Sequence, residues 1–183
     1  MGAKGSQTKA MIRTEAYKLF AEKGFKEVTM KDICESTGLS RGGLYRHYAG
    51  TQEIFSEILS EEYSIADRIE RHESAKTILE DMLQAIEKEI MEKEFSLSLA
   101  IYEYASMGNE DFFIRIHEKA KKRWIHLIQY GIETKEFQET DPDRVSDLIL
   151  YYYQGLRMWS RVIPFDNRTA KYYAESVRQM LYL

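Results

Sequence analysis

Residues 40–47, with the sequence SRGGLYRH, bring together side chains that donate hydrogen bonds to anions. Arg41 and Arg46 carry positive charge, while Tyr45 and His47 add further donors suited to phosphate oxygens. The guanidinium of Arg41 could also donate two hydrogen bonds to the edge of a guanine base. The chemistry that this stretch could perform is therefore binding to nucleic acid.

Two adjacent glycines, Gly42 and Gly43, stand where the first turn of a helix is expected. Each glycine inside a helix costs roughly 1 kcal/mol relative to alanine, so helix stability alone does not favour them. Without side chains here, the main chain could approach phosphates or bases closely. A loop followed by a solvated helix face would fit the same residues, so their types alone leave both interpretations open.

Two short capped helices surround the glycine pair. Thr29 can cap a helix with Asp32 three residues later as its capping-box partner, and Gly38 marks the end of that helix. Ser40 is the cap of the next helix, and an amphipathic helix over about 7–23 precedes both. This order predicts a helix-turn-helix unit, which can place the start of its last helix in a DNA major groove.

The rest of the chain also has helical periodicity. Only two prolines and ten glycines interrupt 183 residues, and the apolar residues recur at spacings of three and four. The sequence therefore predicts an all-α fold of about nine helices, with a helix-turn-helix domain over 1–49 and a larger helical bundle over 50–183. The expected helices of the bundle span about 51–72, 74–90, 95–107, 110–134, 142–163 and 168–183.

Composition excludes several classes of protein. The single cysteine, Cys34, cannot form an internal disulfide, and no apolar run approaches the ~20 residues of a membrane span. With a start that lacks the apolar core of a signal peptide, these features predict a cytoplasmic protein without a membrane partner. Cys34 is interpreted as a small buried residue, with a redox sensor as the alternative.

The charges indicate which part of the chain could bind a polyanion, and the histidines bear on whether the protein is an enzyme. Residues 1–60 hold nine Lys and Arg against seven Asp and Glu, whereas residues 61–183 hold seventeen against twenty-three. Only the N-terminal third is therefore suited to a polyanion, and by a small excess. The four histidines are scattered, and no catalytic constellation is visible, so we expect neither an enzyme nor a metal or other cofactor.

A series of short segments in the first 60 residues resembles the TetR family of bacterial transcriptional regulators. The resemblance implies a DNA-binding domain here, followed by a helical region that binds an effector and dimerises. The matching segments are Ala16–Phe20, Gly24-Phe25, Thr29–Ile33, Thr37–Gly42, Leu44–Tyr48 and Glu53-Ile54. By this resemblance Leu39, Leu44 and Tyr48 hold the recognition helix in place. The residues predicted to lie at the DNA are Thr29, Lys31, Ser40, Arg41, Gly42, Gly43, Tyr45, Arg46, His47 and Thr51.

Two positions depart from the family pattern. Such proteins usually have Thr or a similar side chain where this chain has Gly43, and Lys at the start of the fourth helix where it has Thr51. The missing Lys would be a phosphate contact, for which Lys9 or Lys31 could compensate. The alternative hypothesis is a helical ligand-binding or interaction protein that has lost specific DNA recognition.

The C-terminal helices are rich in aromatic residues, which suggests an apolar pocket between bundle helices. These rings could equally be core residues. Glu103, if it faced inward, would favour a cationic ligand, and it could also be a surface charge. The residues predicted to contact a small-molecule effector are Phe95, Leu99, Tyr102, Glu103, Trp124, Tyr152 and Trp159.

The expected helix over 142–163 has a second apolar face that needs a partner. The resemblance implies that the last two helices form a homodimer, which would read a palindromic operator. The predicted interface residues are Tyr151, Gly155, Met158 and Val162, with Tyr173, Val177 and Met180 from the last helix. Together these inferences predict a ligand-responsive regulator, most members of this family being repressors that a small effector releases from DNA.

Overall fold

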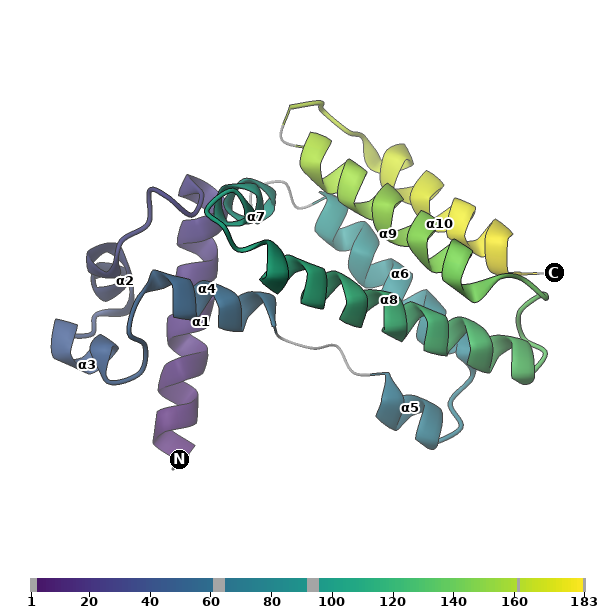
Figure 1. The fold of residues 1–183 in the computed structure, drawn as a ribbon, viewed down its shortest axis with the longest axis horizontal. Helices are drawn as coiled ribbons and strands as arrows, with labels where there is room; N and C mark the ends of the chain where they lie inside the picture. Colours follow the sequence, from purple (N-terminus) through teal and green to yellow (C-terminus); the bar gives the residue numbers. More distant parts are fainter. Residues whose placement is uncertain (1–2, 61–64, 92–95, 161, 183) are drawn as a thin grey trace. The chain divides into compact units, whose positions relative to one another are not determined.

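The computed structural model describes residues 3–60, 65–91, 96–160 and 162–182, and every regular element in these ranges is an α-helix (Figure 1). This confirms the predicted all-α class. The described helices are ten instead of about nine because the helix expected over 51–72 is found as two, α4 and α5. They are α1 (Ala3–Lys23), α2 (Met30–Thr37), α3 (Arg41–Tyr45), α4 (Thr51–Leu59), α5 (Ala66–Glu70), α6 (Ala75–Met91), α7 (Ser98–Ala105), α8 (Glu110–Glu133), α9 (Pro142–Trp159) and α10 (Asn167–Leu181).

The chain forms two compact units. The first consists of residues 1–62 and 94–113, and the second of residues 63–93 and 114–183. The first unit thus takes in α4 and α7 as well as the three helices before residue 49, because Phe55 of α4 and Tyr104 of α7 belong to its core. The division into a DNA-binding and an effector-binding domain stays a prediction.

An aromatic cluster forms the centre of the first unit. Ile12 and Phe20 lie eight residues apart on one face of α1, and both are completely buried. The ring of Phe20 lies 4.8 Å from that of Phe55, and the ring of Phe25 lies 4.7 Å from that of Tyr104. Such edge-on and tilted contacts add to the stabilisation from buried apolar area. They tie α1, α4, α7 and the loop after α1 into one body.

The helix-turn-helix is built as the sequence predicts. The Thr29 hydroxyl accepts a hydrogen bond from Asp32 N–H, and the Asp32 carboxylate accepts one from Thr29 N–H, which completes the capping box of α2. Gly38 ends α2 in the left-handed conformation, at φ 70°. The Ser40 hydroxyl then accepts from Gly43 N–H at 3.2 Å and caps α3. Because α2 and α3 have only eight and five residues, they depend on these caps and on packing.

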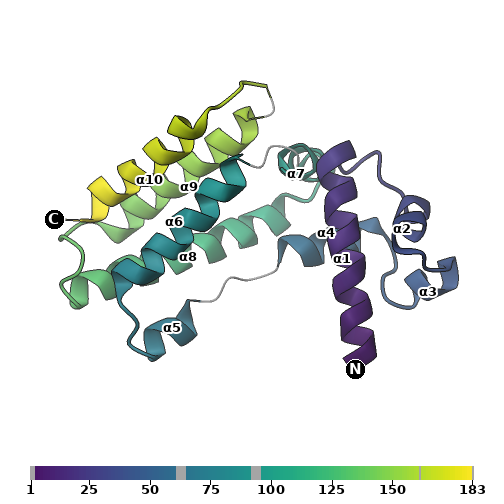
Figure 2. The ribbon, with the colours of Figure 1, turned by 180° about the vertical axis from the view of Figure 1, so that it is seen from behind.

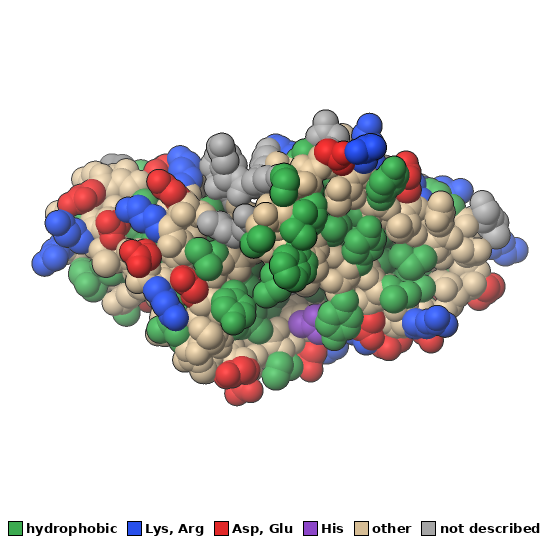
Figure 3. Space-filling model, turned by 90° about the horizontal axis from the view of Figure 1, so that it is seen from above, with side chains coloured by type: hydrophobic (Ala, Val, Ile, Leu, Met, Phe, Trp, Pro, Cys, Tyr) green, Lys and Arg blue, Asp and Glu red, His purple; other side chains and the backbone are tan. Residues whose placement is uncertain are grey.

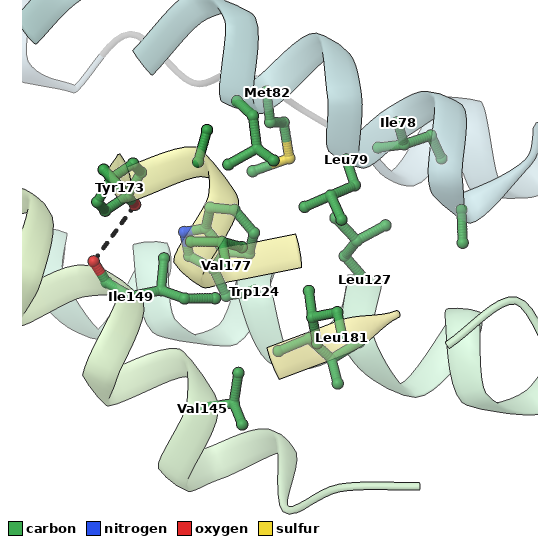
Figure 4. Close-up of a cluster of buried hydrophobic side chains, with 14 of the residues drawn as sticks. Ile78, Leu79, Met82, Trp124, Leu127, Val145, Ile149, Tyr173, Val177 and Leu181 are labelled. Atoms are coloured by element: carbon green, nitrogen blue, oxygen red, sulfur yellow. Dashed lines mark hydrogen bonds between the residues drawn. The ribbon is translucent and has the colours of Figure 1, made fainter. Parts of the chain in front are cut away.

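The second unit is a bundle of α6, α8, α9 and α10, seen from both sides in Figures 1 and 2. Tyr173, Val177 and Leu181 repeat at intervals of four along α10, and all three are completely buried. They pack with Trp124 of α8 and Ile149 of α9 in one core (Figure 4). The Tyr173 hydroxyl donates to the Ile149 carbonyl at 3.4 Å, which gives this buried polar group a partner.

A tight turn after α8 holds the beginning of α6. Glu136 and Phe137 both donate their amides to the carbonyl of Gly131, so the chain folds back over the helix. The Glu136 carboxylate then accepts from Ala75 N–H at 2.9 Å and Lys76 N–H at 3.1 Å. These amides are among the N–H groups that a helix leaves unpaired at its start. Residues from a distant turn therefore cap α6.

Replacing Glu136 tests this cap. Burial alone would raise the pKa of Glu136, but the hydrogen bonds from Ser74 and the two amides outweigh it and lower the pKa below its usual range. We expect Glu136→Gln to reduce the free energy of unfolding at pH 7 by about 1–2 kcal/mol, because the amide group cannot accept at both oxygen positions. The measurement is urea unfolding of both proteins between pH 7 and pH 3.

The sign of the pH dependence follows from the lowered pKa. The stabilisation is present above the unfolded-state pKa of about 4.5 and is lost as the pH falls through the lower folded-state value. The difference between wild type and Glu136→Gln should therefore shrink at acidic pH, and Glu139→Gln, an exposed neighbour, should show no such difference. An equal loss at every pH would contradict this account.

Candidate nucleic-acid interface

The helix α3 is anchored on one side and open on the other. Leu44 is completely buried and Tyr48 is 1% exposed, in the same core as the residues of α1 and α2. Arg41, Tyr45 and Arg46 are exposed, and Tyr45 keeps 53% of its surface. The side chains that could bind nucleic acid therefore point away from the core of the first unit.

Among the residues that the structure describes, neither backbone conformation nor packing requires glycine at position 42. Neither Gly42 nor Gly43 has the positive φ that favours glycine, unlike Gly24 and Gly38. A Cβ added at Gly42 would meet no atom within 4 Å. A Cβ at Gly43 would lie 3.3 Å from Ser40 Oγ, a tight contact without a severe clash. Because neither backbone conformation nor internal packing forbids a side chain at Gly42, its absence leaves the exposed backbone of this turn open to a partner.

The other residues predicted at the DNA lie on the same unit, with α2 and α3 next to each other (Figure 1). Thr29 is exposed, and its hydroxyl also bonds Asp32 in the capping box. Lys31 is exposed on α2, where its Nζ lies 3.6 Å from the carboxylate of Glu35. His47 and Thr51 are half-buried. These residues therefore belong to one unit, and their contacts with DNA remain a prediction.

Lys9, expected as a substitute phosphate contact, has a partner of its own. Its Nζ lies 3.0 Å from the Glu57 carboxylate, and Arg13 binds the other oxygen of Glu57 at 2.7 Å. The ammonium also lies 4.6 Å from the centre of the Tyr48 ring. Burial would raise the pKa of Glu57, but Lys9, Tyr48 and Arg13 outweigh it and keep the pKa low. Glu57 lies 48 residues from Lys9, so the spacing of residues in the sequence gives no sign of this pair.

The expected effector contacts do not come together within either unit. Tyr102 is 61% exposed, Trp124 is 2% exposed in the core of the second unit, and Tyr152 and Trp159 are exposed on α9. Phe95 lies outside the described residues. The helix expected over 95–107 is found as α7 (Ser98–Ala105), which turns Tyr102 to solvent.

Leu99 and Glu103 are part of the first unit, where they pack against the loop that follows α1. A Cβ added at Gly24 would lie 3.2 Å from Leu99 Cδ2 and 2.6 Å from Glu103 Oε2. The Glu103 carboxylate accepts hydrogen bonds from Phe25 N–H and Lys26 N–H. In this structure Glu103 therefore holds the loop after α1, and its role at an effector stays a prediction.

An open groove lies between α6 and α10 of the second unit. Its volume is about 540 Å³, and its lining is mixed in charge. None of the predicted effector contacts lines it. The lining residues are Asp81, Gln84, Ala85, Glu87, Lys88, Met91, Ala170 and Lys171.

An apolar surface runs along α9. Tyr151 is 65% exposed, Met158 is 53% exposed, and Val162, just after the helix, is 74% exposed. A Cβ at Gly155 would meet nothing within 4 Å, so the backbone is accessible there. Figure 3 shows hydrophobic side chains gathered on the side of the second unit that α9 and α10 form. We call Tyr151, Gly155, Met158 and Val162 the α9 apolar surface.

Two of the interface residues expected from α10 lie elsewhere. Tyr173 and Val177 are completely buried in the core of their own chain, so they are not available to a partner. Met180 is partly buried against the same core. The reason is that α10 has a single strong apolar face, and α6, α8 and α9 cover it.

The described part of the chain shows neither a metal site nor a membrane-spanning helix. No group of three or more His, Cys, Asp or Glu there could hold a metal ion. None of its helices is both long and apolar enough to cross a membrane. Cys34 is half-buried on α2.

Comparison with known proteins agrees with this architecture. The family model for bacterial regulatory proteins of the tetR family matches residues 12–58. The HTH-type transcriptional regulator YfiR of Bacillus subtilis is 30% identical over 142 residues, which cover 73% of this chain and 69% of YfiR. The HTH-type transcriptional repressor KstR2 of Mycobacterium tuberculosis is 25% identical over 139 residues, which cover 72% of this chain and 68% of KstR2.

The whole fold has relatives among solved structures as well. A protein from Saccharomonospora viridis, solved in complex with choline, superimposes with a TM-score of 0.70 at 18% identity, over 97% of this chain and 99% of that one. At this identity the likeness concerns the fold. The relationship to YfiR, with the match to the family model, shows that this chain belongs to the TetR family, whose members are transcriptional regulators and not enzymes.

Proposed function

We propose that this regulator represses its target genes by binding a palindromic operator as a homodimer, with α3 of each chain in the major groove. The observation that carries the proposal is the exposed first turn of α3. It has no side chain at Gly42 or Gly43, although the chain leaves room at Gly42, and Arg41 and Tyr45 flank it. A bare turn beside hydrogen-bond donors suits close approach to DNA. The relative KstR2 is named as a repressor.

The α9 apolar surface supports the dimer. Large apolar side chains gathered on one exposed face are typical of a protein interface. Gly155 lies between Tyr151 and Met158 and lets a second helix approach closely. A two-fold axis through α9 would place the same residues of both chains against each other. Two copies of α3 would then read half-sites about 34–36 Å apart.

The proposed effector is a small, largely apolar molecule that binds the second unit. The S. viridis protein of the same fold was solved with choline, a small organic cation. Tyr152 and Trp159, both exposed aromatic residues of α9, are the predicted contacts that remain accessible. An effector releases DNA only to the extent that it binds the released form more tightly than the DNA-bound form.

A protein that has lost specific DNA recognition is the second candidate. Thr51 stands where a Lys is usual, so one expected phosphate contact near the reading head, by which we mean α2 and α3, is missing. Lys9, which could replace it, is paired with Glu57. Selection of duplexes from a random DNA pool by the purified protein separates the two functions. An enriched palindrome supports the repressor, whereas folded, dimeric protein that enriches no sequence supports the second candidate.

The glycine at position 42 gives a direct prediction. We expect Gly42→Ala to bind the selected operator about tenfold more weakly, because the added methyl group would hold the backbone away from the DNA. The same variant should be as stable as wild type or up to about 1 kcal/mol more stable, since the Cβ meets nothing in the chain and alanine favours helix. Fluorescence anisotropy and thermal unfolding measure the two effects.

Gly5→Ala is the matched control for this variant. Gly5 lies in α1, and a Cβ there also meets no atom within 4 Å. It should leave operator affinity unchanged. Wild-type affinity of Gly42→Ala would contradict the proposed close approach at this turn.

Arg41 is expected to read a base. Arg41→Ala should weaken operator binding by about 1–3 kcal/mol while changing affinity for random duplex much less. Arg46→Ala, expected to remove a phosphate contact, should weaken both to a similar extent. Titrations at one fixed salt concentration compare each variant with wild type on both duplexes. An equal loss of affinity on both duplexes for Arg41→Ala would show that Arg41 contacts a phosphate instead of a base.

The dimer can be tested on Met158. Met158→Glu puts a charge at the centre of the α9 apolar surface and should shift the protein from dimer to monomer at micromolar concentration. Met107→Glu is the control, because Met107 is 49% exposed and lies in the first unit. Multi-angle light scattering gives the mass of each variant. A wild-type monomer, or an unchanged dimer for Met158→Glu, would contradict this interface.

A further inference from the structure

The loop between α1 and α2 is built around a carboxylate from α7. Glu103 accepts hydrogen bonds from Phe25 N–H at 2.7 Å and from Lys26 N–H at 3.0 Å, both on its Oε2 atom. Gly24, with φ +85°, lets the chain turn here, and a Cβ on it would lie 2.6 Å from the same oxygen. The carboxylate therefore occupies the inside of the turn.

Stabilisation of α1 does not account for a carboxylate at this place. The C-terminal end of a helix carries partial negative charge, which disfavours a nearby anion. The amide of Gly24 already caps α1 by donating to the Phe20 carbonyl at 3.0 Å. The next two amides, those of Phe25 and Lys26, donate to Glu103 and not to carbonyls of α1. The contact therefore serves to join α7 to the loop.

The helix α7 is itself firmly fixed in the first unit. Ala100 is completely buried and Tyr104 is 4% exposed. The ring of Tyr104 lies 4.7 Å from that of Phe25 and 5.2 Å from that of Phe55. Its hydroxyl shares a hydrogen bond of 2.9 Å with the hydroxyl of Ser56. The helix therefore contacts the loop and α4 at the same time.

The helix α7 lies between two points at which the chain passes from one unit to the other. The chain passes between the two units after residues 62, 93 and 113, and α7 lies between the last two of these points. At the other end of the contact, Lys26 is followed three residues later by Thr29, the cap of α2. A carboxylate on α7 thus holds the loop from which the helix-turn-helix begins.

We propose that Glu103 is a positioning residue for DNA recognition: by holding the amides of Phe25 and Lys26, it fixes the direction in which α2 and α3 face the DNA. The inference rests on the proposed function and adds a named residue to it. If α2 and α3 are free to turn, only a fraction of the molecules hold the orientation that fits the operator. The observed affinity falls in proportion to that fraction.

The test uses three variants of the full chain. Glu103→Ala removes the acceptor. Glu103→Gln keeps one oxygen, which suffices because both amides donate to a single atom. Glu27→Ala is the charge control, since Glu27 is exposed in the same loop. For Glu103→Ala we expect operator affinity to fall about tenfold and random-duplex affinity to stay within about twofold, whereas the other two variants keep the wild-type ratio of the two affinities.

Amide hydrogen exchange, followed by NMR, reports on the contact without DNA. In Glu103→Ala the amides of Phe25 and Lys26 should lose protection, and exchange should also quicken in α2 and α3. Unchanged protection, or lost protection with an unchanged ratio of operator to random-duplex affinity, would overturn the inference.

The exchange measurement also separates failure of this inference from failure of the proposed function. If the wild-type protein selects no DNA sequence, the proposed function fails. Exchange then decides only whether Glu103 holds α2 and α3 in place: faster exchange that reaches α2 and α3 supports this structural part of the inference, and faster exchange confined to residues 25 and 26 overturns it.

Discussion

The burial of Leu44 and Tyr48 in the core of the first unit is the interaction on which the reading head depends. A helix of five residues has no stability of its own, so α3 exists because its apolar side is buried and Ser40 caps its start. Burying that side turns Arg41 and Tyr45 to solvent. The surface that we propose binds DNA is therefore the consequence of a packing constraint on the opposite side of a very short helix.

Long-range carboxylate contacts hold the elements around this helix. Glu57 joins α4 to α1 through Lys9, Glu103 joins α7 to the loop after α1, and Glu136 joins the turn after α8 to the start of α6. Each of these carboxylates accepts from donors far away in sequence, and charge-assisted hydrogen bonds are the stronger kind. These three carboxylates of an acidic chain thus connect its helices to one another. Because residues 1–60 have only a small positive excess, the proposed DNA recognition depends on the shape and the donors of the first turn of α3.

Local features of this fold could be predicted from the sequence, and long-range ones could not. The caps at Thr29 and Ser40 were predictable because each depends on residues three positions apart. The bond of Glu103 to Phe25 spans 78 residues, and periodicity carries no information about such pairs. Periodicity also identifies apolar faces without showing what covers them. It therefore gives the same prediction for Tyr173, which is a core residue, and for Tyr151, which is exposed.

The central claim is that two copies of α3 enter successive major grooves on one face of the DNA. Hydroxyl-radical footprinting of the dimer on its selected operator tests it most directly, because the cleavage pattern reports which backbone segments the protein covers. The account predicts two protected regions on the same face, with centres about 10 base pairs apart, or a multiple of that spacing. A single protected region, or protection that runs evenly around the duplex, would contradict it.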